Sequence, residues 1–295
     1  MAEPLFKRLV LIGIGHIGAS IAGGLKLHPG TVANLVISDA DPAHLKRAEE
    51  LGFGDEYIAD ATKAVQGADG VLLCTPVGVF AVLAKQIAPH LAPGCVLSDV
   101  GSTKQSVIRD VGPFVPEGVH FVPAHPMAGT EFSGPDAGVP NLFEGRWCLL
   151  TPEAGTDEAA IGKIETLWQT LGARTARMDA THHDRVLAIV SHLPHLIAFT
   201  ICGTADDLAD ETRDEVLQFA ATGFRDFTRI AASDPVMWRD IFINNKDALL
   251  EMLARFSEDA QAMARAVRWG DTEYIEDRIN RSRKIRKSLI DIKQA

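Results

Sequence analysis

A glycine-rich turn near the start of the chain restricts the fold more than any other feature. Residues 13–18 read GIGHIG, which sets glycines in G-x-G-x-x-G spacing between the strand-like run RLVLI and a segment with helical spacing. Gly13 would permit the tight turn, Gly15 would let a pyrophosphate approach the backbone amides, and Gly18 would let helix and strand pack closely. The spacing alone is a weak signal, but the strand before it and the helix after it are the expected context. The turn therefore predicts a dinucleotide-binding fold.

The end of the second strand-like run, NLVISD, supports the same prediction. It closes on Asp39, with Asp41 following and no arginine adjacent. A carboxylate there accepts hydrogen bonds from the ribose of NAD and repels the 2′-phosphate of NADP, although Asp39 could instead only cap the next helix. We therefore expect NAD as the cofactor and regard NADP as less suitable. The expected cofactor-binding residues, which include the loop after the run GVLLC, are Gly13, Ile14, Gly15, His16, Ile17, Gly18, Asp39, Thr75, Pro76 and Val77.

The order of strand-like and helix-like segments divides the chain into two predicted domains. The runs RLVLIG, NLVISD, GVLLCTP, CVLSDVG, VHFVPAH and WCLLTP alternate with helical segments, a rhythm typical of a parallel sheet with helices on both faces. One more helix and an edge strand are expected before Asp179, and after it every segment carries helical spacing. We predict an α/β Rossmann-type NAD-binding domain over residues 1–178. An all-α substrate-binding and dimerisation domain is predicted over residues 179–295, with a kink at Pro194.

Charge, cysteine pattern and hydropathy narrow the partners and the compartment. A net charge of -10 gives no electrostatic reason to expect nucleic acid or an anionic membrane as partner. The 4 cysteines form no Cys-x-x-Cys pair, as is usual in a reduced, cytoplasmic protein. Residues 186–205 approach the length of a membrane span, but the histidines and the proline inside them favour a buried helix. We therefore expect a cytoplasmic protein with no nucleic-acid or membrane partner.

Two polar segments follow strand-like runs of the predicted sheet. SDVGSTK follows the run around Leu97, and PAHPMAGTE follows the run around Phe121. Because parallel strands deliver their loops to one edge, Ser102 and His125 are predicted to lie together near the nicotinamide. A histidine there can accept a proton from a substrate hydroxyl while hydride leaves the same carbon, and a serine can hold either partner in place. His125 could instead be an ordinary loop histidine, but we predict that both residues are catalytic.

Five motifs in this order carry a resemblance to a known family: LIGIGHIGAS, SDVGSTK, HPMAGTEFSG, SHLPH and GFRDFTRIAASDPVMWRDIFINN. Together they resemble the prephenate/arogenate (cyclohexadienyl) dehydrogenase family of tyrosine biosynthesis, over nearly the whole chain. The first motif is shared with all Rossmann enzymes, whereas the last three in combination are specific. The resemblance implies an NAD-dependent oxidative decarboxylation of prephenate, arogenate or both, to 4-hydroxyphenylpyruvate or tyrosine. It also implies that His125 accepts the hydroxyl proton and that Ser102 supports it.

The family's substrates are carboxylate anions, so cationic side chains are expected around them. Arg225 and Arg229 are four residues apart on one face of a predicted helix, which suits two contacts to one ligand. The resemblance points to Arg229 as the principal carboxylate clamp, while a surface or interdomain salt bridge is the alternative for either arginine. The expected substrate-binding residues are Arg229, His195, Thr130, Arg225 and Glu131.

Other functions remain open from the residues alone. A reductase or β-hydroxyacid dehydrogenase with the same two-domain plan would be expected to use a lysine as proton donor in its helical domain. A protein that senses NAD without turnover would be expected to lack the polar loop around His125. The sequence HHD at residues 182–184, with His192 and His195, suggests a metal site, but no further ligand has matching spacing. We therefore expect no metal.

The helical half also bears on assembly. The run LLEMLARFSEDAQAMARAV carries more apolar side chains than one Rossmann face can cover. A homodimer through the helical domain is therefore expected, as the resemblance also implies. We expect no regulatory domain in the chain, so that any inhibition by tyrosine would act at the active site.

Overall fold

The computed structural model describes residues 3–130, 132–207, 215 and 218–291. The chain forms two units, residues 1–246 and residues 247–295, and each is described by itself. Glu131, which we expected at the substrate, lies outside the described residues. The domain boundary expected after residue 178 falls inside the first unit and stays a prediction.

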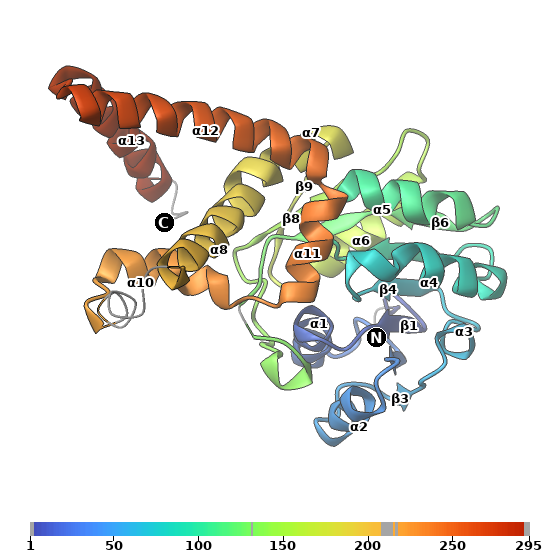
Figure 1. The fold of residues 1–295 in the computed structure, drawn as a ribbon. Helices are drawn as coiled ribbons and strands as arrows, with labels where there is room; N and C mark the ends of the chain where they lie inside the picture. The colour runs from blue at the N-terminus through green and yellow to red at the C-terminus, as the bar shows by residue number, and fades with distance from the viewer. Residues whose placement is uncertain (1–2, 131, 208–214, 216–217, 292–295) are drawn as a thin grey trace. The chain divides into compact units, whose positions relative to one another are not determined.

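A parallel sheet forms the centre of the first unit, with strand order β3-β2-β1-β4-β5-β6 (Figure 1). Its strands are β1 (Leu9–Ile12), β2 (Leu35–Ser38), β3 (Glu56–Tyr57), β4 (Gly70–Leu73), β5 (Val96–Asp99) and β6 (His120–Val122). Every residue of β1, β2, β4 and β5 is buried, because helices cover both faces of the sheet. The strand order reverses between β1 and β4. In sheets of this kind the ligand crevice forms at that reversal, outside the carboxyl ends of the strands.

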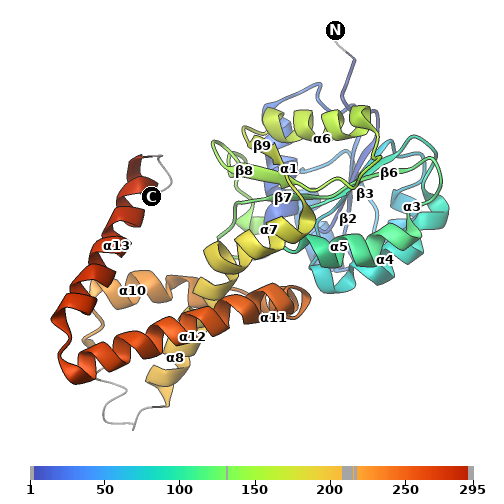
Figure 2. The same ribbon diagram turned by 90° about the horizontal axis from the view of Figure 1, so that it is seen from above.

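Alternate residues of each strand face two separate apolar cores. Leu9 and Leu11 pack in one core with α1 (His16–Leu27) and α6 (Glu158–Thr170), whereas Val10 and Ile12 pack in the other with α4 (Phe80–Ile87) and α5 (Lys104–Val111). Figure 2 shows these two pairs of helices on opposite sides of the sheet. The helices are α1 (His16–Leu27), α2 (Pro42–Glu50), α3 (Ala61–Ala64), α4 (Phe80–Ile87), α5 (Lys104–Val111) and α6 (Glu158–Thr170). Short 3-10 helices are η1 (Val77–Val79), η2 (Ala88–His90), η3 (Gly112–Phe114) and η4 (Pro135–Ala137). The predicted α/β plan of this half is confirmed.

A second, smaller sheet differs from the expectation of a single parallel sheet. The run VHFVPAH forms two strands, because β6 stays in the first sheet while β7 (Ala124–Pro126) pairs antiparallel with β8 (Trp147–Leu150). β8 in turn pairs in parallel with β9 (Arg174–Arg177), the edge strand expected before Asp179. Pro123 separates β6 from β7, and a proline has no N–H to donate to a strand ladder. His125 therefore lies within a strand of the second sheet and not in a loop.

The described residues between 180 and 245 are helical apart from short connections, as predicted. The elements are α7 (Ala180–Leu187), the π-helical turn η5 (Ala188–His192), α8 (Leu193–Asp206), α10 (Thr222–Thr228), η6 (Arg229–Ala232) and α11 (Pro235–Asn244). The interruption expected at Pro194 occurs just before it. The amide of Leu193 donates to the carbonyl of Ala188, five residues back, which is the spacing of a π turn.

The second unit contains α12 (Lys246–Trp269, whose first residue closes the first unit) and α13 (Thr272–Asp291). An ion pair between Arg278 and Asp259 joins the two helices. Two helices cannot enclose a core, and large apolar side chains stay exposed on both. The most exposed of these are Leu250, Val267, Trp269, Ile279, Ile285 and Ile290.

Among the described residues, one helical run, Ala180–Asp206, is long and apolar enough to cross a membrane by length and composition. A core helix of a soluble protein meets the same two criteria. The run carries buried polar side chains with partners inside the protein. His192 receives a hydrogen bond from the amide of Asn245 at Nδ1, and the same amide donates to the carbonyl of Asp184. These contacts fix the start of α8 against the end of α11.

Burial of His192 predicts how stability depends on pH. Burial lowers the pKa of His192 from 6.5 to about 4, so below pH 6.5 the unfolded chain binds a proton that the folded chain does not. The free energy of unfolding should therefore fall as the pH drops through this range, and the part due to His192 is about 3 kcal/mol. His125 and His183, whose pKa values are also lowered by burial, act in the same direction.

The measurement is urea unfolding at several pH values between about 7 and about 4.5, for the wild type and for His192→Gln. The variant should show the shallower dependence on pH, whatever its stability near neutrality. His90→Gln, which removes an exposed histidine, controls for the loss of a histidine as such. Equal slopes for wild type and His192→Gln would contradict the expectation.

Candidate active site

The glycine turn has the geometry that its sequence predicts. Gly13 has φ 101°, and a Cβ there would lie 2.7 Å from the carbonyl carbon of Cys74. A Cβ on Gly18 would overlap the carbonyl oxygen of Gly13, so helix α1 approaches the turn too closely for any other residue. By contrast, a Cβ on Gly15 would meet nothing within 4 Å. The space beside Gly15, at the start of α1, is therefore open, as an approaching pyrophosphate requires.

Asp39 lies beside this turn, at the end of β2. Its carboxylate accepts the amide of Ile14 at 2.8 Å and the amide of Asp41 at 2.8 Å. The cap of helix α2 is Asp41, whose carboxylate accepts the amide of Ala43, so Asp39 is not the helix cap. The side chain of Asp39 stays 14% exposed at the crevice. A carboxylate thus stands at the sheet edge while also bracing the glycine turn.

The segment after β7 lies against the start of α1. His16 Nδ1 is 2.7 Å from the carbonyl oxygen of Ala137, and Val139 donates its amide to the hydroxyl of Ser20 at 3.0 Å. Arg47 of α2 pairs with Asp136 at 2.7 Å. These contacts attach η4 to α1 and α2 on the nucleotide side of the fold. His16, expected at the cofactor, therefore also anchors this segment.

The loop after β4 contributes the other expected cofactor contacts. Thr75 has a buried hydroxyl that no other described residue pairs with, and Pro76 leads into η1, which begins at Val77. A Cβ on Gly78 would overlap the carboxylate of Asp240 on α11. The helical part of the first unit therefore packs directly on the loop predicted to bind the cofactor.

His125 belongs to a chain of three buried side chains. Its Nδ1 is 2.9 Å from Nε2 of His183, and Nδ1 of His183 is 2.8 Å from Oδ1 of Asp184. His125 is 7% exposed, and the other two are 0% exposed. Sequence reasoning considered His183 and Asp184 only as metal ligands and missed this contact. No local pattern could have found it, because the two histidines are separated by 58 positions in the chain.

The carboxylate of Asp184 ends this chain at the first turn of α5. It accepts the amides of Lys104 at 2.7 Å and Gln105 at 2.9 Å. Burial acts to raise the pKa of Asp184, but the hydrogen bonds from His183 and from these two amides outweigh it and hold the pKa below its ordinary range. Asp184 is therefore ionised at neutral pH.

His125 is kept neutral by its surroundings. Burial lowers its pKa well below the ordinary value, and the ammonium group of Lys104 lowers it further. Lys104 is itself fully buried, with Nζ 2.6 Å from Asp99 and 2.6 Å from the carbonyl oxygen of Ala124. A neutral imidazole is the form that can accept a proton.

Ser102 lies in the turn between β5 and α5, two residues before Lys104. The side chain is half-buried, and its hydroxyl makes no hydrogen bond to any residue that the structure describes. The turn is held by the amide of Gly101, which donates to Asp99 at 2.7 Å. A Cβ on Gly101 would lie 2.7 Å from a methyl group of Val77. Ser102 is thus placed beside the expected cofactor loop with its hydroxyl available.

His195 lies in an aromatic cluster at the start of α8. Its ring stacks on Trp238 with ring centroids 3.6 Å apart, and its Nδ1 is 2.9 Å from the carbonyl oxygen of Ser191. Burial lowers the pKa of His195, and the positive charge of Arg229 contributes to the same effect. The structure therefore brings Arg229 within electrostatic reach of His195. Phe199 and Phe242 complete the cluster around Trp238.

The remaining expected substrate residues are more exposed. Arg225 on α10 lies 3.5 Å from the hydroxyl of Thr222, and Thr130 accepts the amide of Phe132 at 3.3 Å. Within the described ranges, no group of three His, Cys, Asp or Glu side chains could hold a metal ion. Both ring nitrogens of His183, considered above as a metal ligand, make hydrogen bonds.

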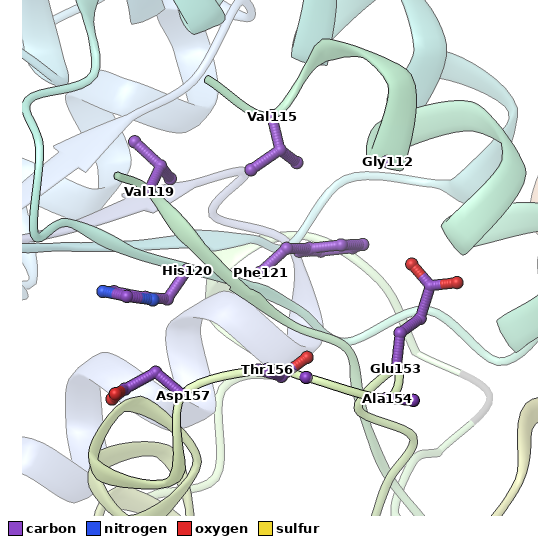
Figure 3. Close-up of a pocket in the computed structure, with 10 residues that line it drawn as sticks. Gly112, Val115, Val119, His120, Phe121, Glu153, Ala154, Thr156 and Asp157 are labelled. Atoms are coloured by element: carbon purple, nitrogen blue, oxygen red, sulfur yellow. The ribbon is translucent and has the colours of Figure 1, made fainter. Parts of the chain in front are cut away.

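A pocket of about 270 Å³ lies elsewhere, at the amino end of β6 (Figure 3). Val119, His120 and Phe121 line one side of it, and the loop that carries Glu153 and Asp157 lines the other (Figure 3). None of the expected site residues lines this pocket. The expected cofactor residues Gly13, Asp39 and Thr75 instead follow the carboxyl ends of β1, β2 and β4.

Comparisons with known proteins show the family of the chain. Residues 21–177 match the family model of the prephenate dehydrogenase nucleotide-binding domain, and residues 179–280 match that of the prephenate dehydrogenase dimerization domain. The cyclohexadienyl dehydrogenase of Zymomonas mobilis is 39% identical over 286 residues, which cover 97% of each chain. The prephenate dehydrogenase of Lactococcus lactis is 34% identical over 287 residues, 96% of this chain and 77% of that protein.

A solved structure shows the same fold. The prephenate dehydrogenase from A. aeolicus, in complex with hydroxyphenyl propionate and NAD+, superposes with a TM-score of 0.86 at 29% identity, covering 97% of this chain and 98% of that one. The two family models together span most of the chain, and the sequence relatives cover nearly all of it. The chain therefore belongs to the prephenate and cyclohexadienyl dehydrogenase family, the oxidoreductases of tyrosine biosynthesis that its motifs resemble.

Proposed function

We propose that this enzyme catalyses the NAD-dependent oxidative decarboxylation of prephenate, arogenate or both, with His125 as the base and Ser102 as its support. The observation that carries the proposal is the buried, neutral His125 at the end of a hydrogen-bonded chain. In the reaction such a base takes the proton of the ring hydroxyl. The half-buried hydroxyl of Ser102 can hold either the imidazole or the substrate hydroxyl in line.

The glycine turn fits NAD as the cofactor. The open space at Gly15 leaves room for a pyrophosphate at the start of α1, and Asp39 supplies a ribose acceptor at the end of β2. The cofactor set is Gly13, Ile14, Gly15, His16, Ile17, Gly18, Asp39, Thr75, Pro76 and Val77. Two carboxylates, Asp39 and Asp41, would repel the 2′-phosphate of NADP, so NADP is the weaker cofactor. Bound NAD supplies the hydride acceptor.

The protein's part in the reaction is orientation and proton removal. The hydroxyl proton passes to Nε2 of His125 as hydride leaves the carbon that bears the hydroxyl. The resulting dienone carries a ring carboxylate that is vinylogous to a β-keto acid. The C–C bond to that carboxylate therefore breaks and carbon dioxide leaves. Its electron pair moves through the ring to the carbonyl oxygen, which takes a proton back from the imidazolium of His125 and becomes the phenolic hydroxyl of the aromatic ring. No metal is needed at any step.

Substrate carboxylates are proposed to bind around Arg229. Its charge reaches His195, whose ring is fixed by the stack on Trp238 and by the carbonyl of Ser191. An arginine beside a rigid histidine suits a planar carboxylate, because the guanidinium can donate two parallel hydrogen bonds. Thr130, Arg225 and Glu131 complete the proposed set.

We further propose that residues 1–178 bind the nucleotide and that residues 179–295 bind substrate and form a homodimer. The exposed apolar residues of α12 and α13, such as Val267 and Ile285, suit a surface that a second copy covers. The four cysteines are unpaired thiols, which suits the cytoplasm.

Light scattering at micromolar concentration should give twice the chain mass of 31.8 kDa. A mass near that of one chain would refute the dimer.

The first test of function is NADH formation by the purified protein, with prephenate and arogenate in separate reactions and with NADP in place of NAD as a further comparison. We expect turnover with at least one substrate and a higher kcat/KM with NAD, because Asp39 disfavours a 2′-phosphate. Absence of turnover with both substrates, in a protein shown to bind NAD, would return the reductase and sensor functions to consideration.

Two variants separate catalysis from binding. His125→Asn should lower kcat on the order of a hundredfold or more with little change in KM, because the base is lost but the substrate contacts stay. Arg229→Ala should act mainly by raising KM, because a carboxylate partner is lost. A kcat for His125→Asn close to that of wild type would make His125 a structural residue.

A further inference from the structure

We propose that His183 and Asp184 are positioning residues for His125, which they hold in the tautomer with its proton on Nδ1 and a free lone pair on Nε2. The catalytic consequence rests on the proposed function, whereas the tautomer itself can be measured without turnover. The ionised carboxylate of Asp184 cannot donate, so it determines the direction of each hydrogen bond between itself and His125.

An ionised carboxylate only accepts hydrogen bonds. Asp184 already accepts the amides of Lys104 and Gln105, which fix its two oxygens at the first turn of α5. Its Oδ1 is also 2.8 Å from Nδ1 of His183. That nitrogen must therefore carry the proton. Because Asp184 is held by backbone, rotation of its side chain cannot reverse this assignment.

A neutral imidazole with its proton on Nδ1 has an acceptor at Nε2. Nε2 of His183 lies 2.9 Å from Nδ1 of His125, so His125 must be the donor of that bond. Neutral His125 then has no proton left for Nε2. The carboxylate of Asp184, two hydrogen bonds away from His125, thus determines that Nε2 of His125 keeps the lone pair that can accept the substrate proton.

The opposite direction of the hydrogen bond between the two histidines would leave His125 unable to accept a proton. If His183 carried both protons, it would donate to His125 and leave the proton of His125 on Nε2, where no proton could be accepted. Burial lowers the pKa of His183, and the charge of Lys104 acts in the same direction, against the hydrogen bond to Asp184. His183 is therefore neutral before the reaction begins, as the donor order from Asp184 requires.

The same chain accommodates the proton once it arrives. The substrate hydroxyl proton forms an N–H bond at Nε2 of His125, which becomes an imidazolium that still donates from Nδ1 to His183. The positive charge then lies beside an acceptor whose own N–H points at the carboxylate of Asp184. No further reactant is required, and the carboxylate does not itself take the proton.

The tautomer can be read directly by nitrogen NMR on the full-length protein labelled with ¹⁵N-histidine, near neutral pH and without substrate. The resonances of His125 and His183 are identified by their loss in His125→Asn and His183→Asn. We expect both rings to be protonated on Nδ1 and unprotonated on Nε2. In His183→Asn, whose shorter side chain reaches Asp184 but not His125, the proton of His125 should move wholly or partly to Nε2. A wild-type His125 protonated on Nε2 would overturn the proposal, whatever the enzyme's activity.

Kinetics separate this role from mere packing. His183→Asn should lower kcat by about tenfold or more with KM little changed, but by less than His125→Asn, since an imidazole remains. His183→Gln places an amide oxygen near the position of Nε2, so it should accept from His125, recover much of the lost kcat and keep the proton on Nδ1. His182→Asn, an exposed neighbour on the same helix, is the matched control and should retain the wild-type rate.

Several outcomes would contradict the proposal even if the variants fold as the wild type does by thermal unfolding. One is a wild-type kcat for His183→Asn. Another is an equal loss in His183→Asn and His183→Gln with no change in the tautomer of His125, which would mean that His183 only fills space. Failure of the proposed function looks different, because the wild type would show the expected tautomers but no turnover with prephenate or arogenate.

Discussion

The site depends on the contact between the carboxylate of Asp184 and the first turn of α5. The contact spans 80 residues of sequence and joins the helical part of the first unit to the nucleotide-binding sheet. Amides at a helix start have no partner inside the helix and carry partial positive charge, so they hold a carboxylate in its ionised form. An ionised Asp184 requires a donor from His183, and that requirement reaches His125. The free amides at the start of α5 thus determine which nitrogen carries the proton in His125, a residue of the second sheet.

The buried ion pair of Lys104 and Asp99 holds β7, the strand that carries His125. Both side chains are 0% exposed, and burying two charges costs solvation that their attraction roughly offsets. Stability alone therefore does not explain the pair. Its further contacts do, because Lys104 donates to the carbonyl of Ala124 and Asp99 accepts the amide of Ala124 at 3.2 Å. Ala124 precedes His125, so the pair fixes the backbone that carries the proposed base. An apolar replacement would leave both backbone groups of Ala124 without these partners.

Local patterns predicted most of the fold, and contacts between distant segments account for what they missed. The glycine spacing and the strand rhythm identified the parallel sheet, because both depend on neighbouring residues. The break at Pro123 was visible in the sequence, but its consequence, a second sheet with β8, depends on residues over twenty positions away. His125 could be predicted as a candidate base from its segment. Its partners could not, because His183 lies 58 positions further on and was placed only by the packing of α7 on α5.

The six residues from Asp99 to Lys104 connect all these contacts. Gly101 packs on Val77 of the expected cofactor loop, Ser102 presents a hydroxyl, and Lys104 contacts both the strand of His125 and, through its amide, Asp184. In the proposed reaction a hydride and a proton leave one C–OH group, so their two acceptors must keep a fixed separation. A single short turn that contacts the cofactor loop and the base strand together can fix that separation. Movement of this turn would displace the cofactor and His125 at once. The turn is held in place by the buried ion pair of Lys104 and Asp99 and by Gly101, which has no room for a side chain.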